Sequence, residues 1–139
     1  MADLVRRIWP YLAGLGTAFI IILVLEAALH LIFPMPSSAN MNDSAAIDQA
    51  MRAMPATAFA ALLVAYVIGS FAGGLTAALA SDGLSITPSI VTGCALTIAG
   101  AANVFAMYHP TWFRVASLLT YLPFSYLGCL AARGRKAKH

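Results

Sequence analysis

Residues 8–33, IWPYLAGLGTAFIIILVLEAALHLIF, contain one acidic residue, Glu26, and no lysine or arginine. As an α-helix this stretch would be about 39 Å long at about 1.5 Å per residue, which exceeds the about 30 Å hydrocarbon core of a bilayer. The apolar run is also much longer than the about 7–15 residues of a signal-peptide core. The stretch therefore predicts a retained transmembrane helix, with Pro10 in its first turn and Pro34 after its end.

The composition of the whole chain also predicts a membrane protein. Of its 139 residues, 61% are hydrophobic and only 9% are charged. A soluble domain is about 45–50% apolar and about 25% charged, so this chain could not cover a water-facing surface. The net charge of +3 is small and most of it lies at the chain ends, which excludes a basic nucleic-acid-binding face. The basic end instead predicts contact with anionic lipid headgroups.

Three more apolar segments follow the first. We predict spans at about 8–33, 56–80, 88–108 and 112–132, forming one membrane domain over residues 1–132 with a basic, frayed tail at 133–139. The loops after the second and third spans are short turns, at 81–83 and 109–110.

Only the connection between the first two spans is long and polar. Asn and Asp residues there provide helix-capping groups, and Ile47, Met51 and Met54 follow at helical spacing. This pattern predicts a short amphipathic helix on the outer membrane surface. A plain surface loop fits the same residues.

The basic residues predict the orientation. Arg52 and Arg114 lie on one side of the predicted membrane, and six lie on the side of the termini: Arg6, Arg7, Arg133, Arg135, Lys136 and Lys138. Cytoplasmic flanks carry the excess of lysine and arginine. The expected fold is therefore an all-α, integral membrane four-helix bundle, up-down-up-down, with both termini cytoplasmic.

Small residues recur on two of the predicted spans. In lipid, helices pack closely where glycine and alanine let their backbones approach. These residues predict tight helix contacts, either within one chain or between chains. They are Ala65, Gly69, Gly73, Gly74 and Ala77 in the second span, and Gly93 and Gly100 in the third.

Five polar residues are predicted to lie in the outer half of the membrane or just above it. Glu26 and His30 are one turn apart and share a helix face, and Asn103 lies on the glycine-bearing face of the third span. His109 follows that span, and Arg114 lies in the first turn of the fourth. A charge at mid-membrane costs on the order of 3 kcal/mol, so Glu26 should face the bundle, with His30, Arg114 and Asn103 as its partners.

Three interpretations of Glu26 are open at this stage. It can be a structural residue that fixes helix register, a part of a site for a proton, ion or small solute open to the outer face, or, with His30 and His109, a metal ligand. The sequence lacks the His-Glu-x-x-His motif, a Gly-x-Ser-x-Gly elbow and a phosphate-binding glycine loop. We therefore predict no metal, no cofactor and no catalytic residues, and we favour a non-enzymatic role; a membrane enzyme stays open as a third class, which would need a bound metal or cofactor.

The chain resembles a group of small, uncharacterised bacterial four-span inner-membrane proteins with no known activity. The resemblance covers most of the chain and lies in these motifs: Leu25-Glu26-Ala27-Ala28-Leu29-His30, Pro34-Met35-Pro36, Gly69 to Gly74, Asn103, His109-Pro110-Thr111-Trp112-Phe113 and Leu122-Pro123-Phe124-Ser125-Tyr126-Leu127-Gly128. It implies a multi-pass protein of the bacterial inner membrane.

Two functions are compatible with these features. The first is a non-enzymatic protein that acts through helix contacts, as an accessory subunit of a membrane complex or as a homo-oligomer. Its partners would be membrane lipids and another membrane protein or itself. The alternative is a small transporter or channel for a proton, ion or small solute, with an outward-facing polar site at Glu26, His30 and Asn103.

Overall fold

The chain folds entirely as helices joined by turns and loops over residues 1–35, 40, 42–81 and 84–138, which are the residues that the computed structural model describes. The elements are α1 (Ala2–Ile32), α2 (Ser44–Ala53), α3 (Ala56–Ala80), α4 (Thr87–Ala106) and α5 (Thr111–Lys136). All except α2 are long and apolar enough to cross a membrane. The predicted all-α, multi-pass membrane protein is confirmed at this level. Pro36 and, in the predicted turn at 81–83, Asp82 and Gly83 lie outside the described residues.

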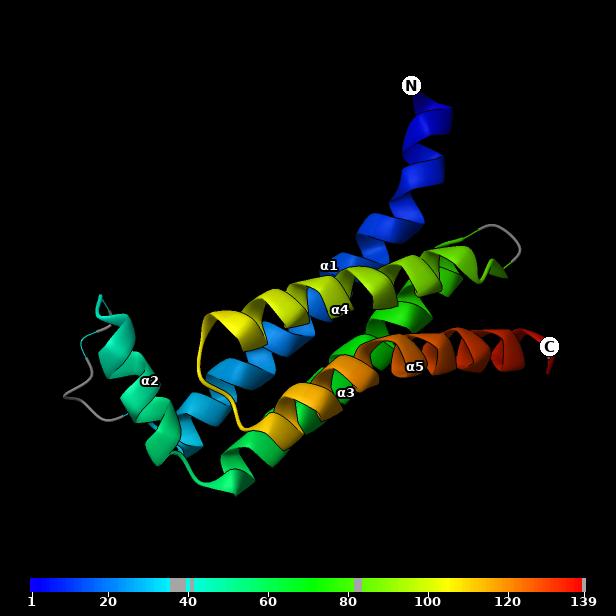
Figure 1. The fold of residues 1–139 in the computed structure, drawn as a ribbon. Coiled ribbons are helices and arrows are strands. Elements are labelled where there is room, and N and C mark those ends of the chain that lie inside the picture. Colours follow the sequence, from blue (N-terminus) through cyan, green and yellow to red (C-terminus); the bar gives the residue numbers. More distant parts are fainter. Residues whose placement is uncertain (36–39, 41, 82–83, 139) are drawn as a thin grey trace.

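Two helices are longer than the sequence predicted. α1 begins at Ala2 rather than near residue 8, so the prediction that Pro10 lies in its first turn is wrong: this proline lies inside the helix. Residues 1–9 are all exposed, and Figure 1 shows this part of α1 standing away from the other helices. At the other end of the chain, the predicted frayed tail is helical to Lys136. The positive charges of Arg133, Arg135 and Lys136 stabilise the partial negative charge at this end of the helix dipole.

The short helix α2 confirms the predicted amphipathic helix. Its N-cap is Asp43, whose side chain accepts a hydrogen bond from the Ala45 backbone N–H at 3.0 Å. Asp48 Oδ1 accepts from the Tyr108 N–H at 3.0 Å, and the Arg52 guanidinium lies 4.0 Å from the centre of the Tyr108 ring. These two contacts fix α2 to the loop between α4 and α5.

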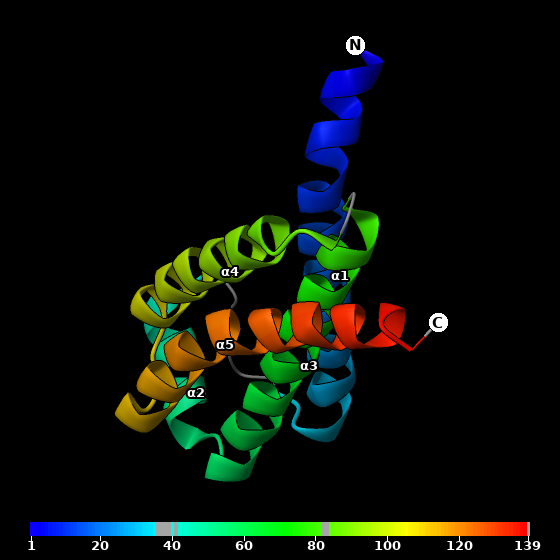
Figure 2. The same ribbon diagram turned by 90° about the vertical axis from the view of Figure 1, so that its right-hand side faces the viewer.

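The helix α3 is the centre of the assembly. It packs against α1, α4 and α5, and α4 also contacts α1 and α5. Figure 2 shows α1 and α3 running side by side and α5 passing across α3.

The predicted small-residue stripes face helices of the same chain. On α3, Gly69 and Gly73 lie against Ile22 and Ala18 of α1, where an added Cβ would clash. The other face of α3 meets α5, where Gly74 lies against the backbone of Ser125. Ala65 and Ala77 are buried on α3, and the two glycines of α4, Gly93 and Gly100, contact Leu122 and Tyr121 of α5.

Two buried serines add hydrogen bonds between three helices. Ser125 Oγ of α5 donates to the Ser89 carbonyl of α4 at 2.7 Å, and Ser89 Oγ donates to the Gly74 carbonyl of α3 at 2.7 Å. Both serines are fully buried. Because lipid offers no competing hydrogen bonds, these contacts fix the register of α3, α4 and α5.

Candidate functional site

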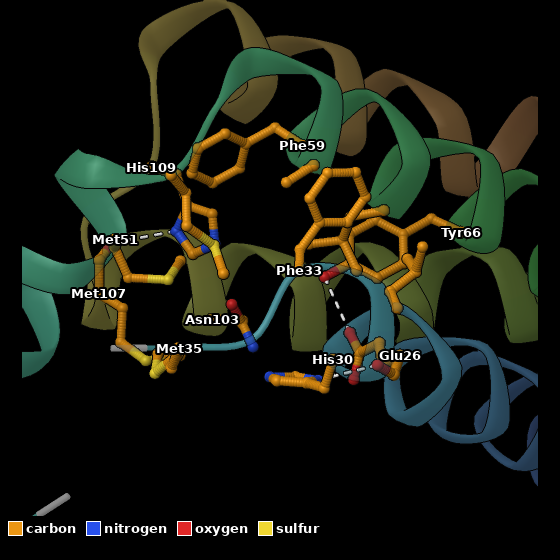
Figure 3. A pocket seen from close by; sticks show the side chains of 14 residues that line it. Glu26, His30, Phe33, Met35, Met51, Phe59, Tyr66, Asn103, Met107 and His109 are labelled. Atoms are coloured by element: carbon orange, nitrogen blue, oxygen red, sulfur yellow. Dashed lines mark hydrogen bonds between the residues drawn. The ribbon is translucent and has the colours of Figure 1, made fainter. Parts of the chain in front are cut away.

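A cavity of about 180 Å³ lies where α1 and α4 end and α3 begins. Its walls come from the last turns of α1, from α2, from the first half of α3, from the end of α4 and from the loop that follows α4 (Figure 3). The lining is mainly apolar, with phenylalanine, leucine and methionine side chains around a few polar groups. A mostly apolar cavity with a few converging polar groups is the usual form of a small-ligand site.

Four of the five predicted polar residues line this cavity: Glu26, His30, Asn103 and His109. They come from three separate segments of the chain, and Figure 3 shows them around the same space. Arg114 is the exception and is not part of the lining. Four residues that sequence depth and helix face had grouped therefore lie around one cavity, although their contacts differ from the predicted ones.

The hydrogen-bond partner of Glu26 is a residue that the sequence did not indicate. Tyr66 of α3 donates its hydroxyl to Glu26 Oε1 at 3.2 Å. The prediction that His30 pairs with this carboxylate is wrong, because the His30 ring donates from Nδ1 to the Glu26 backbone carbonyl at 2.8 Å. One signal could have found Tyr66: it lies three residues before Gly69, on the face of α3 that packs against α1.

Arg114 has a different environment from the predicted one. It is half-buried, and its Nε is buried without a hydrogen-bond partner among the described residues. No ion pair between Arg114 and Glu26 is present in the described part of the chain, so the predicted pairing is not formed. Its charge acts on His109 instead.

His109 is held through its ring by one hydrogen bond and two aromatic contacts. Its Nδ1 donates to the Met107 carbonyl at 3.1 Å. The ring stacks on Phe113, with centroids 5.2 Å apart, and meets Phe59 edge-on at 6.0 Å. Only 3% of the residue is exposed.

This environment also determines the charge of His109. Burial lowers the pKa of His109 below its ordinary value, the hydrogen bond to Met107 opposes this, and the positive charge of Arg114 lowers it further. Asp48 acts in the opposite direction as the smallest influence. The lowered pKa favours the neutral imidazole.

The described residues contain no group of three histidine, cysteine, aspartate or glutamate side chains that could hold a metal ion. Glu26, His30 and His109 share a cavity without forming such a set. The two cysteines lie elsewhere, Cys94 exposed on α4 and Cys129 buried in α5, and both are free.

A second, more open hollow lies at the other end of the helices. It has a volume of about 610 Å³ and is lined by Asp3, Arg6 and Arg7 of α1 together with hydroxyl groups near the start of α4. Its lining is polar, as expected of helix ends at the level of lipid headgroups. It brings together none of the predicted polar residues.

Comparisons with models of protein families, with curated proteins and with solved structures find no match to this chain.

Proposed function

We propose that this chain is a multi-pass inner-membrane protein that binds a small cation, or a small solute carrying positive charge, in the cavity around Glu26 and allows it to cross the membrane. The observation that carries the proposal is the convergence of Glu26, His30, Asn103 and His109 on one cavity of about 180 Å³. A structural role for Glu26 would need neither a cavity nor polar groups from three separate segments.

The proposed orientation is up-down-up-down with both termini in the cytoplasm. Its support is the excess of lysine and arginine beside the two termini, six residues against two. In this orientation the ends of α1 and α4 and the start of α3 face outward, and the cavity opens to the outer side of the bacterial inner membrane.

The preference for positive charge follows from the lining. Among the described residues around the cavity, Glu26 is the only aspartate, glutamate, lysine or arginine. One side-chain donor, Tyr66, reaches its carboxylate, which has room for about four hydrogen bonds and so retains capacity for a cation. Phe33, Phe59 and Tyr66 add aromatic faces, which attract cations through their ring quadrupoles.

The substitution Glu26→Gln tests this proposal. It keeps the size of the side chain and its ability to accept from Tyr66, but it removes the negative charge. We expect at least a tenfold loss of cation flux in proteoliposomes, measured for protons, sodium, potassium and small organic ammonium ions. Asp43→Asn is the matched control, because it makes the same chemical change at an exposed N-cap where asparagine also caps a helix. Equal flux in wild type and Glu26→Gln for every cation that the wild type passes, or no flux of any of them in the wild type, would contradict the proposal.

A second candidate is assembly through helix contacts, and one observation favours it. In the most apolar 18-residue stretch of α1, only 17% of the residues are buried by the rest of the chain, against 39% in the corresponding stretches of α3 and α5. Leu12, Phe19, Ile20, Leu23 and Val24 are exposed on this helix. The glycine stripes do not support assembly, because α1 and α5 of the same chain already cover them.

Assembly predicts a defined oligomer or a second polypeptide in native mass spectrometry of protein extracted gently from its membrane. We expect Ile20→Trp on α1 to dissociate such an assembly, and Leu119→Trp on α5 to leave it intact. Both side chains are similarly exposed, at 64% and 68%. A monomer in the wild type would end this candidate.

A further inference from the structure

Methionine is concentrated around the cavity. Of the five methionines that the structure describes, four line it: Met35, Met51, Met54 and Met107. Methionine often fills irregular gaps in a core, where its sulfur has no special role. Here Met35, Met54 and Met107 are half-buried and border the cavity, while Met35 and Met54 also pack against the buried core.

Three of these side chains lie on one side of the cavity. Figure 3 shows Met35, Met51 and Met107 on the side where His109 lies, with Met51 next to the His109 ring. These residues come from the segment after α1, from α2 and from the residue after α4. The sequence gives no hint of this convergence, because the residues are up to seventy-two positions apart (35 to 107).

His109 has the arrangement of a metal-ligating histidine. A carbonyl can only accept a hydrogen bond, so the contact with the Met107 carbonyl puts the proton on Nδ1 and leaves the Nε2 lone pair of the neutral ring available. Ligating histidines usually donate their other ring N–H to a carbonyl or carboxylate in this way. Stacking on Phe113 further fixes the ring plane.

The donors are also held in position relative to one another. Met51 and Met54 belong to α2 and the residue that follows it, while Met107 and His109 flank Tyr108. Tyr108 is the residue that Asp48 and Arg52 of α2 bind, through a 3.0 Å hydrogen bond and a cation–π contact. The two pairs of donors are therefore fixed to each other by contacts outside the cavity.

From these positions we infer that Met35, Met51, Met54, Met107 and His109 bind a soft monovalent metal ion, Cu⁺ or Ag⁺. Thioethers select soft ions, whereas zinc and harder divalent ions need thiolates, several imidazoles or carboxylates. The described residues provide no such set. Glu26 in the same cavity supplies the negative charge that neutral thioether and imidazole donors lack. The inference rests on the proposed function, because it names the cation that the cavity takes.

The test is silver binding, since Ag⁺ has the softness of Cu⁺ without its redox chemistry. Purified protein carrying Cys94→Ala and Cys129→Ala is titrated with Ag⁺ and followed by calorimetry and native mass spectrometry. We expect one Ag⁺ per chain. Silver X-ray absorption should show sulfur neighbours, which in the cysteine-free protein can only be methionine thioethers. No binding, or binding without sulfur neighbours, would overturn the inference.

The matched variant is Met51→Leu with Met107→Leu. Leucine has nearly the volume of methionine and such exchanges are well tolerated in packed cores, so the fold is retained while two sulfur donors are lost. We expect the affinity for Ag⁺ to fall at least tenfold, with an unchanged thermal midpoint in the absence of silver. The same pair is repeated with the native cysteines in case the cysteine-free chain does not fold. An unchanged affinity would show that the bound silver does not use these methionines.

The outcomes separate this inference from the proposed function. If Glu26-dependent flux of another cation is found but silver does not bind, the cavity has the proposed role and the metal assignment is wrong. If silver binds through the methionines but no cation crosses the membrane, the metal site stands and transport is wrong.

Discussion

Replacing Gly74 by alanine is expected to prevent this protein from reaching its folded state. An added Cβ at this position of α3 would overlap the carbonyl group of Ser125 in α5. Overpacking of a core side chain costs about 1–3 kcal/mol, and a clash with backbone exceeds this because a backbone cannot change rotamer. Moving α5 away would also break the 2.7 Å hydrogen bond from Ser125 to the Ser89 carbonyl of α4. We expect a loss of at least about 3 kcal/mol, seen as aggregated protein in size-exclusion chromatography or as a much lower thermal midpoint.

Gly16→Ala is the control for this prediction. It makes the same change in the middle of another spanning helix, but nothing lies within 4 Å of the added Cβ. Alanine is also the better helix former by about 1 kcal/mol in soluble helices, so this variant should fold as well as the wild type. If Gly74→Ala were as stable as Gly16→Ala, the close contact between α3 and α5 would be wrong.

The span positions could be predicted because hydropathy and length determine them almost alone. α3 begins and ends at the predicted residues 56 and 80, and α4 and α5 begin within one residue of the prediction. The start of α1 could not be predicted in the same way. Residues 2–7 are polar enough to leave the bilayer, but they still form helix because their backbone hydrogen bonds are satisfied within it.

The candidate site was predictable only as far as the membrane depth of its polar residues and the helix faces that carry them. Counting turns from Pro34 and Tyr108 put Glu26, His30 and Asn103 at one end of the bundle, where the cavity is found. The partners of Glu26 were not predictable from periodicity, because they depend on the rotation of each helix about its axis. A rotation by one position exchanges Tyr66 for Ala65 or Val67, and only the register with Gly69 on the face toward α1 distinguishes these cases.

Arg114 shows the same limit of sequence-based prediction, because its expected pairing with Glu26 is not formed. Charge complementarity predicted that it would pair with Glu26, since both lie in the outer half of the bundle. However, α1 and α5 are not in contact within the described part of the chain, and α3 lies between them. Opposite charges on two helices predict an ion pair only when the helices are neighbours, and the neighbour relations come from small-residue packing.

The other large effect is expected at Phe113, the largest side chain that is fully buried. Its ring contacts Phe59 and Tyr66 of α3, with centroids 5.5 and 6.0 Å away, and stacks on His109 at 5.2 Å. The substitution Phe113→Ala leaves a void between α3 and α5 and removes one wall that holds the His109 ring. In soluble cores, Phe→Ala costs about 3–5 kcal/mol. In a membrane the free energy of transferring the ring out of its core is smaller, because the unfolded side chain remains in lipid. The expected loss of stability is therefore mainly lost packing, about 3 kcal/mol.

Phe105→Ala separates this packing loss from a general effect of removing an aromatic ring. Phe105 lies on α4 with 72% of its surface exposed, so its truncation should shift the thermal midpoint by no more than a degree or two (about 0.5 kcal/mol). Phe113→Ala should lower the midpoint strongly and also weaken silver binding, because the His109 ring is no longer held by stacking. Equal midpoints for the two variants would mean that the aromatic cluster does not hold α5 against α3. A lower midpoint with unchanged silver affinity would mean that the Met107 carbonyl alone is enough to orient His109.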